Sequence, residues 1–295
     1  MAQDVPPPDA RELIPAAALA HIPGCETGAH PNAVTVLRGG TVNTSLRVDT
    51  RAGRFVVRLN DAVGGLLGAN HEREALLQAA AAAAGLAPAL IYADPAQGFM
   101  IMGYVEGRAW QAADFGRPEL LWRLGTRLRA LHGLDAPGVA PFDLGALLRR
   151  HSDHLAEALP EERAIFGNLM QQAEAALALC QQGGRKASIV HNDLHHANLI
   201  EAERLYLIDW EYAAVADPIF DLACVLAYYP VAKPYAQSLL DAAGLSDDAS
   251  VGVLAAASSL FVLLSLLWYR RRRISVDVEA TDFAAERALL RRLSA

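Results

Sequence analysis

The chain has 295 residues, of which 53% are hydrophobic and 20% charged, and its formal net charge is −7. This composition is typical of a globular protein rather than a disordered one, and the length allows one large domain or two lobes. The acidic balance argues against a nucleic-acid-binding protein, which would show a basic footprint. Three scattered cysteines are too few for a disulfide framework or a zinc site, and they fit a reducing cytoplasm. The N-terminus has no basic region, so no secretory signal is expected.

The first hundred residues are predicted to be rich in strands. Short β-type runs at 33–37, 45–49 and 54–60 are separated by the turn segments RGGTVNT and TRAG. A helix is expected over NHEREALLQAAAAAAG, which Gly85 ends. Two further strands flank the turn DPAQG. This order predicts an antiparallel sheet with one helix packed on it.

After Gly107 the apolar residues recur at helical spacing, and only two short strand-like segments interrupt the helices. We therefore predict an α+β fold with two lobes, like that of a protein kinase. The small antiparallel, β-rich N-terminal lobe would comprise residues 1–102, and the larger, mainly helical C-terminal lobe residues 103–295. A hinge is expected at about 102–107, and clefts between lobes are common ligand sites.

The apolar segment VGVLAAASSLFVLLSLLWY, residues 251–269, needs separate consideration. It carries no charge, its length approaches the ~20 residues of a membrane helix, and four arginines follow it. It also contains a glycine and three serines, and no second segment of this kind accompanies it. We favour a buried core helix, which is also apolar on all sides, and expect no membrane span.

The segment SIVHNDLHHANLI, residues 188–200, places many polar residues between two apolar runs. A metal-dependent hydrolase could use His191, Asp193, His195 and His196 as ligands, but the flanks are strand-like and no second ligand cluster is found. A simple polar hairpin would leave LYLIDWEY unexplained, where an apolar run ends in Asp209, sixteen residues after Asp193.

A phosphoryl-transfer site explains both segments. This chemistry needs an aspartate that orients the attacking hydroxyl, an asparagine for one metal ion and a second aspartate for the ion that bridges the phosphates. Asp193 and Asn198 have the five-residue spacing of the protein-kinase catalytic loop, and Asp209 follows a strand, as its counterpart does. We favour this interpretation.

A kinase also needs a cation on the third strand and an acid on the following helix. The chain has no lysine before Lys186, so the cation must be an arginine. Arg58 lies in FVVRLN on the expected third strand, and Glu74 lies sixteen residues later, with Glu72 as the second choice.

Two segments imitate kinase motifs, and a third is the better candidate for contact with phosphates. The literal DFG at Asp114–Gly116 precedes the catalytic loop and has no apolar strand before it, and GGLLG at Gly64–Gly68 is only a glycine cluster. RGGTVNTS lies between the first two strands and is better placed to cover phosphates with backbone N–H groups. Its candidate residues are Gly39, Gly40 and Asn43.

These motifs resemble the aminoglycoside phosphotransferase and choline kinase family of small-molecule kinases. RGGTVNTS, FVVRLN, HERE, GLAP, MIMGYVEG, LRALHGLD, HNDLHHANLI, LIDWEYA and DPIFDLA occur in family order between about residues 38 and 230. The resemblance implies a two-lobed kinase-like fold that uses ATP and Mg²⁺.

The resemblance also implies roles for individual residues. Asp193 would be the catalytic base, Asn198 and Asp209 the metal ligands, and Arg58 the phosphate-binding cation in partnership with Glu74. The backbone from Gly103 to Val105 would hold adenine. The arginine departs from the lysine of the aminoglycoside enzymes but is familiar in the bacterial choline-kinase branch, and it offers a permanent charge with a bidentate grip.

The substrate is expected to be a small-molecule alcohol, most simply an amino alcohol or small cation of the choline or ethanolamine type. Residues 251–295 carry seven arginines against four acids, which disfavours polycationic aminoglycosides. A quaternary ammonium would bind aromatic faces, with Glu211, Tyr212 and Trp268 as candidate contacts. Thiamine kinase, an aminoglycoside-type enzyme and a non-catalytic nucleotide-binding module are the alternatives. The sequence gives no indication of the oligomeric state.

Overall fold

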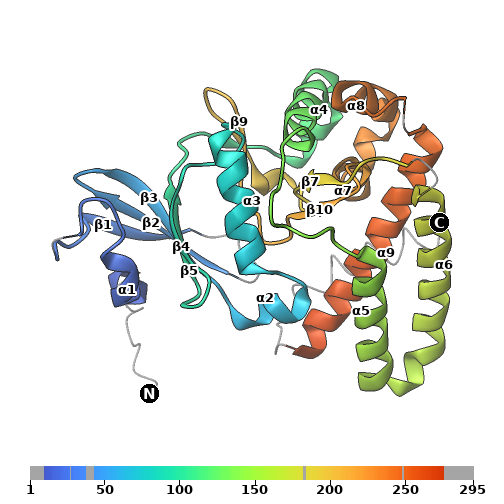
Figure 1. Cartoon of the computed structure of the whole chain (residues 1–295), viewed down its shortest axis with the longest axis horizontal. Helices are drawn as coiled ribbons and strands as arrows, with labels where there is room; N and C mark the ends of the chain where they lie inside the picture. Colours follow the sequence, from blue (N-terminus) through green and yellow to red (C-terminus); the bar gives the residue numbers. More distant parts are fainter. Residues whose placement is uncertain (1–9, 27, 38–42, 182–183, 248, 276–295) are drawn as a thin grey trace, which may run out of the picture.

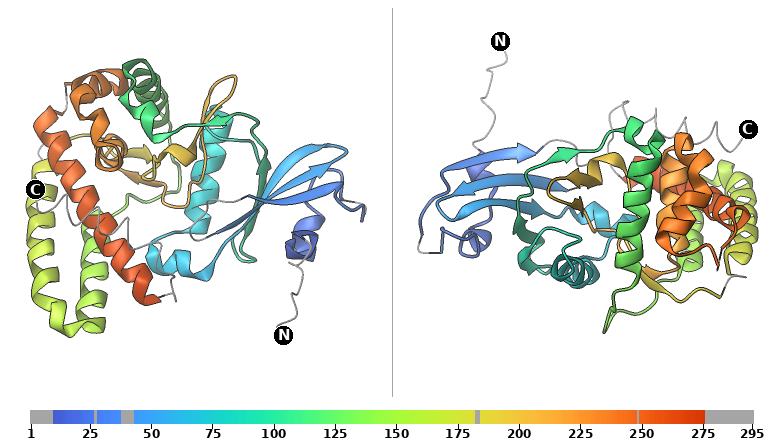
Figure 2. Two further views of the ribbon diagram at one scale, coloured as in Figure 1. Left: turned by 180° about the vertical axis from the view of Figure 1, so that it is seen from behind. Right: turned by 90° about the horizontal axis from the view of Figure 1, so that it is seen from above.

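The computed structural model describes residues 10–275 except 27, 38–42, 182–183 and 248. It has two lobes, with a β-sheet at one end of the molecule and a mainly helical body at the other (Figure 1). Two further views keep this separation (Figure 2). The predicted α+β, kinase-like architecture is confirmed.

The N-terminal sheet has five antiparallel strands in the order β1-β2-β3-β5-β4. Its strands are β1 (Ala33–Leu37), β2 (Thr44–Thr50), β3 (Gly53–Leu59), β4 (Leu90–Asp94) and β5 (Phe99–Gly103). Apolar side chains at alternate positions of β2 and β3 enter one core, to which α1 (Ala16–Leu19) and η1 (Ala10–Leu13) also contribute. The predicted meander and the later strand pair are therefore both present.

Two helices follow β3. The predicted helix is α3 (His71–Ala83), whose first turn is capped by the Asn70 side chain accepting from Arg73 N. It lies between the sheet and the helical lobe (Figure 1). The segment GGLLG, by contrast, falls largely within a short helix, α2 (Ala62–Leu67), and so has helical rather than loop backbone.

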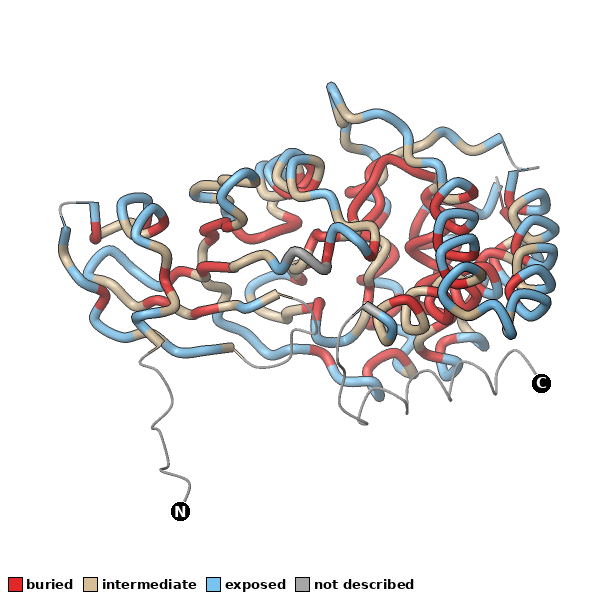
Figure 3. Tube along the Cα trace, turned by 90° about the horizontal axis from the view of Figure 1, so that it is seen from below, coloured by how far each residue is buried: buried red, intermediate tan, exposed pale blue. Residues whose placement is uncertain are grey.

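The C-terminal lobe contains six longer helices among the described residues. They are α4 (Pro118–His132), α5 (Leu144–Ala158), α6 (Arg163–Gln181), α7 (Ile219–Tyr228), α8 (Ala236–Ala243) and α9 (Val251–Ser275). Short 3₁₀ segments accompany them at η2 (Ala112–Gly116), η3 (Pro160–Glu162) and η5 (Pro230–Tyr235). Buried residues concentrate inside this lobe, whereas its outer helices show exposed faces (Figure 3).

Small strands carry the polar loops. A three-stranded sheet joins β6 (Arg108–Ala109), β8 (Leu199–Glu201) and β9 (Leu205–Leu207), and a second sheet pairs β7 (Ser188–Val190) with β10 (Ala214–Ala216). The 3₁₀ turn η4 (His196–Asn198) leads into β8. These short ladders fix the two ends of SIVHNDLHHANLI and the start of IDWEYA.

The apolar segment 251–269 lies in α9. This helix is long and apolar enough to span a membrane, but 56% of its most apolar 18-residue window is buried inside the protein. It packs against α5, α6 and α7. The packing is that of the expected core helix.

The literal DFG motif lies in η2. Asp114 accepts from the backbone N–H of Gln111 and pairs with Arg108, so it caps the 3₁₀ turn η2. This arrangement gives Asp114 a structural role.

Candidate active site

The loop after β7 is held by one buried carboxylate. Asp221 on α7 accepts from the backbone N–H groups of His191 and Asn192, at 2.9 and 2.8 Å, and contacts His132 Nε2 at 2.9 Å. His191 is fully buried, and its Nε2 lies 3.0 Å from the Ile208 carbonyl oxygen. His191 and Asp221 therefore tie the first loop to the segment that carries Asp209.

Two residues of the site have left-handed backbone conformations. Among the described residues, Asn192 (φ 64°) and Asp209 (φ 63°) are the non-glycine residues with positive φ. Asn and Asp tolerate this region better than other L-residues because their short side chains bond locally. Each follows closely on a short strand, so the turn directs the next side chains out of the sheet and into a shared space.

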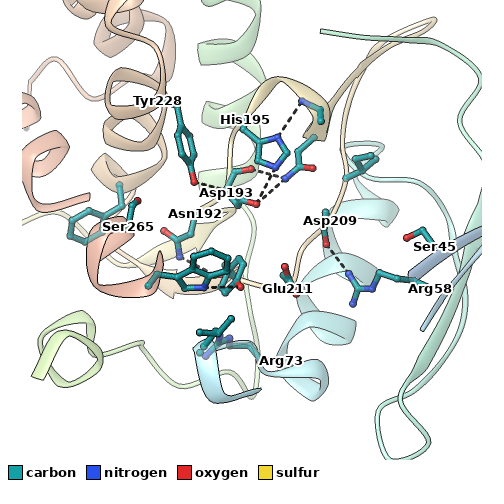
Figure 4. A pocket seen from close by; sticks show the side chains of 18 of the residues that line it. Ser45, Arg58, Arg73, Asn192, Asp193, His195, Asp209, Glu211, Tyr228 and Ser265 are labelled. Atoms are coloured by element: carbon teal, nitrogen blue, oxygen red, sulfur yellow. Dashed lines mark hydrogen bonds and ion pairs between the residues drawn. The ribbon is translucent and has the colours of Figure 1, made fainter. Parts of the chain in front are cut away.

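Asp193 lies at the centre of this space. Its Oδ1 accepts from the Tyr228 hydroxyl at 3.2 Å and its Oδ2 accepts from Asn198 Nδ2 at 3.1 Å (Figure 4). His195 Nε2 lies 3.5 Å from Oδ2. Burial, followed by the nearby Asp209 carboxylate, raises the pKa of Asp193 to about 7.

Asn198 and Asp209 offer oxygen atoms beside Asp193. Asn198 is buried and uses Nδ2 to donate to both the backbone and the carboxylate of Asp193, which turns its Oδ1 toward other partners. Asp209 is about one third exposed and pairs with Arg58. No group of three His, Cys, Asp or Glu side chains with metal-site geometry occurs in the described part of the chain. Two oxygen ligands would suit Mg²⁺, which takes few protein ligands and completes its shell with water and phosphate.

Arg58 connects the lobes. From β3 it donates to Glu74 Oε2 on α3 at 2.5 Å and to Asp209 Oδ1 at 2.9 Å. Arg58 and Glu74 are 4% and 0% exposed. Burial opposes ionisation of Glu74, but the Arg58 charge and the hydrogen bonds from His71 and Arg58 together lower the pKa of Glu74. The sequence-predicted pair is thus in contact, while Glu72 is exposed.

Glu211 and Tyr212 follow Asp209 into the same space. Glu211 is buried and accepts from Asn43 Nδ2 at 2.8 Å, and burial followed by the Asp209 charge raises its pKa to about 8. The Tyr212 hydroxyl accepts from Trp268 Nε1 at 3.1 Å, and the two rings meet edge to face. Gly39 and Gly40, the other candidates from RGGTVNTS, lie outside the described residues.

Arg58, Asp193, Asn198, Asp209, Glu211 and Tyr212 all border one cavity of about 580 Å³. At the sheet end it is lined by Val56, Arg58, Met102, Gly103 and Val105. At the helical end it is lined by Tyr228, Phe261, Ser265, Trp268 and Tyr269. Asp193, Asp209 and Glu211 lie between these ends, with Arg58 and Ser45 toward the sheet and Tyr228 toward the helices (Figure 4).

Comparison with known proteins agrees with this geometry. The sequence model of the phosphotransferase enzyme family matches residues 33–254, well over half of the chain. The chain belongs to this phosphotransferase enzyme family.

Relatives of this chain include LicA of Haemophilus influenzae, which is 26% identical over 210 residues. That match covers 69% of the chain but only 60% of LicA. A solved choline/ethanolamine kinase family protein from Mesorhizobium loti is 25% identical with a TM-score of 0.72, over 93% of this chain and 92% of that one. A structure of LicA in complex with AMP, 18% identical, shares the fold with a TM-score of 0.71, over 89% of this chain and 93% of that one.

Several residues that line the cavity were not predicted as site residues. Arg73 borders the cavity from α3, and α5 contributes Leu144, Leu147 and His151. The bond from the Tyr228 hydroxyl to Asp193 has no signal in the sequence. The α5 residues belong to an ordinary amphipathic pattern, so only tertiary packing distinguishes them from core positions.

Proposed function

We propose that this phosphotransferase transfers the γ-phosphoryl group of ATP to a hydroxyl of a small-molecule alcohol. The observation that carries the proposal is the placement of Asp193, Asn198 and Asp209 in one cavity, between a sheet-side wall with a buried arginine and a helical wall rich in aromatic residues. In a kinase the nucleotide and the acceptor must meet at the transferred phosphoryl group, and these two walls would hold one of them each.

Asp193 is proposed as the catalytic base. Its pKa of about 7 is suited to accepting a proton from a hydroxyl near neutral pH. The bonds from Tyr228 and Asn198 hold the carboxylate in one orientation, so that it aligns the substrate oxygen for in-line attack.

Asn198 and Asp209 are proposed to hold Mg²⁺, which would neutralise charge on the phosphates. Arg58, braced by Glu74, would bind phosphate oxygens, and its bond to Asp209 would be exchanged for contacts with nucleotide. Asn43 and the adjoining Gly39 and Gly40 would cover the phosphates, and the backbone of Gly103 and Val105 would hold adenine. The AMP bound by LicA supports a nucleotide in a protein of this fold.

The acceptor is proposed to be a small cation with a primary hydroxyl, of the choline or ethanolamine type. Aromatic faces at Tyr212 and Trp268 suit a quaternary ammonium, and Glu211 adds a carboxyl group nearby. The choline and ethanolamine kinases among its relatives support this class. Action in the cytoplasm is consistent with Cys25, Cys180 and Cys224, which are all free thiols.

The proposal is tested by measuring ADP release from ATP and Mg²⁺ with choline, ethanolamine, thiamine, kanamycin and glucose as acceptors. We expect turnover with choline or ethanolamine, formation of the phosphorylated alcohol by mass spectrometry, and loss of both in Asp193→Asn. Tight ATP binding without turnover of any alcohol would instead favour a nucleotide-binding module.

A further inference from the structure

One cationic side chain at the cavity wall has no role in the chemistry proposed above. Arg73 lies in the first turn of α3, directly before Glu74, and its side chain borders the cavity. Arg58, the other arginine of the cavity wall, pairs with two carboxylates, whereas Arg73 forms no ion pair with any residue that the structure describes. The neighbouring Glu74 carboxylate is bonded instead to Arg58 and His71. The positive charge of Arg73 therefore has no ion-pair partner within the described chain.

Two contacts fix the orientation of the Arg73 guanidinium group. Its Nε donates to the Ala213 carbonyl oxygen at 2.7 Å, and its Cζ lies 5.1 Å from the centroid of the Phe142 ring. Ala213 directly follows Tyr212, a proposed contact of the acceptor, and Phe142 also borders the cavity. A bond at Nε and an aromatic face together restrain the planar group. Arg73 thus reaches from α3 to a part of the C-terminal lobe that adjoins the proposed acceptor contacts.

The terminal nitrogens of this guanidinium group are accessible to a ligand. The described side-chain atoms that are both buried and unpaired belong to Glu74, His132, His151, Ser188 and Arg271. Nη1 and Nη2 of Arg73 have no hydrogen-bond partner among the described residues and are not among these atoms, so both keep accessible surface. Because the Nε–H is already used, the two terminal groups form one edge that can donate to both oxygens of a carboxylate.

The phosphates of ATP and an anionic group on the alcohol are the two ligands that could bind this edge. The contacts of Arg73 favour the alcohol, because they lie in the C-terminal lobe next to Tyr212. In the view of Figure 4, Arg73 and Asp209, the proposed metal ligand, lie on opposite sides of Glu211. The described residues that line the cavity include no lysine and no second unpaired arginine. One guanidinium edge suits a carboxylate, with one charge and one pair of oxygens, better than a doubly charged phosphate ester.

We propose that Arg73 is a specificity-determining residue that binds a carboxylate of the alcohol substrate. The proposal rests on the function proposed above and narrows its acceptor to an alcohol that carries both an ammonium group and a carboxylate. Nη1 and Nη2 of Arg73 hold the carboxylate, Tyr212 and Glu211 adjoin the ammonium group, and Asp193 aligns the hydroxyl.

The test compares alcohols that differ only in the anionic group. L-serine and L-homoserine present the carboxylate at two distances from the hydroxyl, and in 2-amino-1-propanol and 3-amino-1-butanol a methyl group replaces it. Steady-state kinetics are measured for the parent, Arg73→Gln, Arg73→Lys and Arg51→Gln. Glutamine removes the charge but keeps an amide that can donate to Ala213, and lysine keeps the charge without the fork. Arg51, an exposed arginine between β2 and β3 that does not border the cavity, is the control.

We expect the parent to prefer at least one of the two acids over its methyl counterpart by about tenfold or more in kcat/KM, mainly through KM, as a charge-assisted bond allows. Arg73→Gln should remove this preference, Arg73→Lys should keep part of it, and Arg51→Gln should keep all of it. KM for ATP should be the same in the parent and in all three variants.

Turnover of ethanolamine or choline without any preference for an acid in the parent would overturn this proposal and leave the proposed function in place. A preference that survives in Arg73→Gln, or a rise in KM for ATP in the Arg73 variants, would also overturn it. If Arg73→Gln does not fold, a full preference in Arg73→Lys has the same meaning. If no alcohol is turned over, the proposed function fails, and calorimetric titration with the same four alcohols then decides whether Arg73 binds the carboxylate, since equal affinities of the parent for acids and methyl counterparts would exclude it.

Discussion

Arg58 on β3 and Asp209 after β9 form a 2.9 Å ion pair across 151 residues of sequence. The same guanidinium bonds Glu74, so one buried arginine joins the sheet, α3 and the loop that carries the proposed metal ligand. Breaking a buried pair by removing one partner leaves a charge without compensation. Arg58 is therefore both a structural link between the lobes and the proposed phosphate-binding cation, and experiments must separate these roles.

Arg58→Lys should weaken nucleotide binding, because a point charge loses the fork geometry that bonds two oxygens at once. Charge-assisted bonds contribute about 1.5–3 kcal/mol, so we expect an increase of at least about tenfold in the Kd for ATP, measured by calorimetry. Glu74→Gln should impair the same step. The double variant should lose less free energy of ATP binding than the sum of the losses in the two single variants, since the residues act as one unit.

The matched control for this cycle is Glu72→Gln, which changes an exposed glutamate on the same turn of α3. It should leave ATP affinity and the melting temperature unchanged. The melting temperature of every variant must be measured as well, because loss of folding would mimic loss of binding. If the losses in ATP-binding free energy of Arg58→Lys and Glu74→Gln are strictly additive, the two residues do not act together.

Asp209→Asn should abolish the dependence of nucleotide binding on Mg²⁺. An amide is a poor ligand for a small, doubly charged ion that prefers carboxylate oxygen. Titrations of ATP with and without Mg²⁺ should differ for the parent and coincide for the variant, while Asp241→Asn, at an exposed position on α8, should behave like the parent. If Asp209→Asn binds magnesium-ATP as tightly as the parent, Asp209 is not the metal ligand.

The sequence was most informative where function depends on local spacing. Asp193 and Asn198 lie on one short loop, and Asp209 follows a strand. The sequence pattern alone was therefore enough to select these three residues as candidates. The antiparallel meander was predictable for the same reason, since short alternating strands and turn residues are local signals. Roles for these residues remain predictions that the variants above test.

Features that depend on tertiary packing were not predictable. GGLLG contains no residue that forbids a helix, and it folds largely into α2. His151 has the helical spacing of a core position, and only the crossing of α5 and α9 gives it Arg271 as a partner and the cavity as a neighbour. Tyr228 likewise reaches Asp193 because α7 packs behind the loop.

Two glycines inside helices provide a test of the packing in the helical lobe. A Cβ added at Gly125 on α4 would lie 2.6 Å from Ala242 Cβ on α8, whereas one added at Gly167 on α6 would meet nothing within 4 Å. Gly125→Ala should lower the free energy of unfolding, because overpacking typically costs about 1–3 kcal/mol. Gly167→Ala should raise it by about 0.5–1 kcal/mol through helix propensity. Urea denaturation measures both, and a stabilised Gly125→Ala would mean that α4 and α8 do not approach this closely.

Asp193 imposes a pH dependence on the proposed reaction. A base must be deprotonated to act, so activity should be present above the pKa of Asp193, about 7, and lost as pH falls through that value. The profile of kcat/KM for magnesium-ATP reports the pKa values of the enzyme before the nucleotide binds. Asp193→Asn should reduce kcat by about 100- to 10,000-fold and leave the Kd for ATP nearly unchanged.

Tyr228→Phe tests the assignment of the acid limb to Asp193. The Tyr228 hydroxyl donates to the Asp193 carboxylate and lowers its pKa, in opposition to burial and the Asp209 charge. Removing the hydroxyl should therefore move the acid limb to higher pH. Tyr229→Phe is the control, since that neighbouring hydroxyl bonds His196. A shift of equal size in Tyr229→Phe, or a shift to lower pH in Tyr228→Phe, would show that another group sets the acid limb.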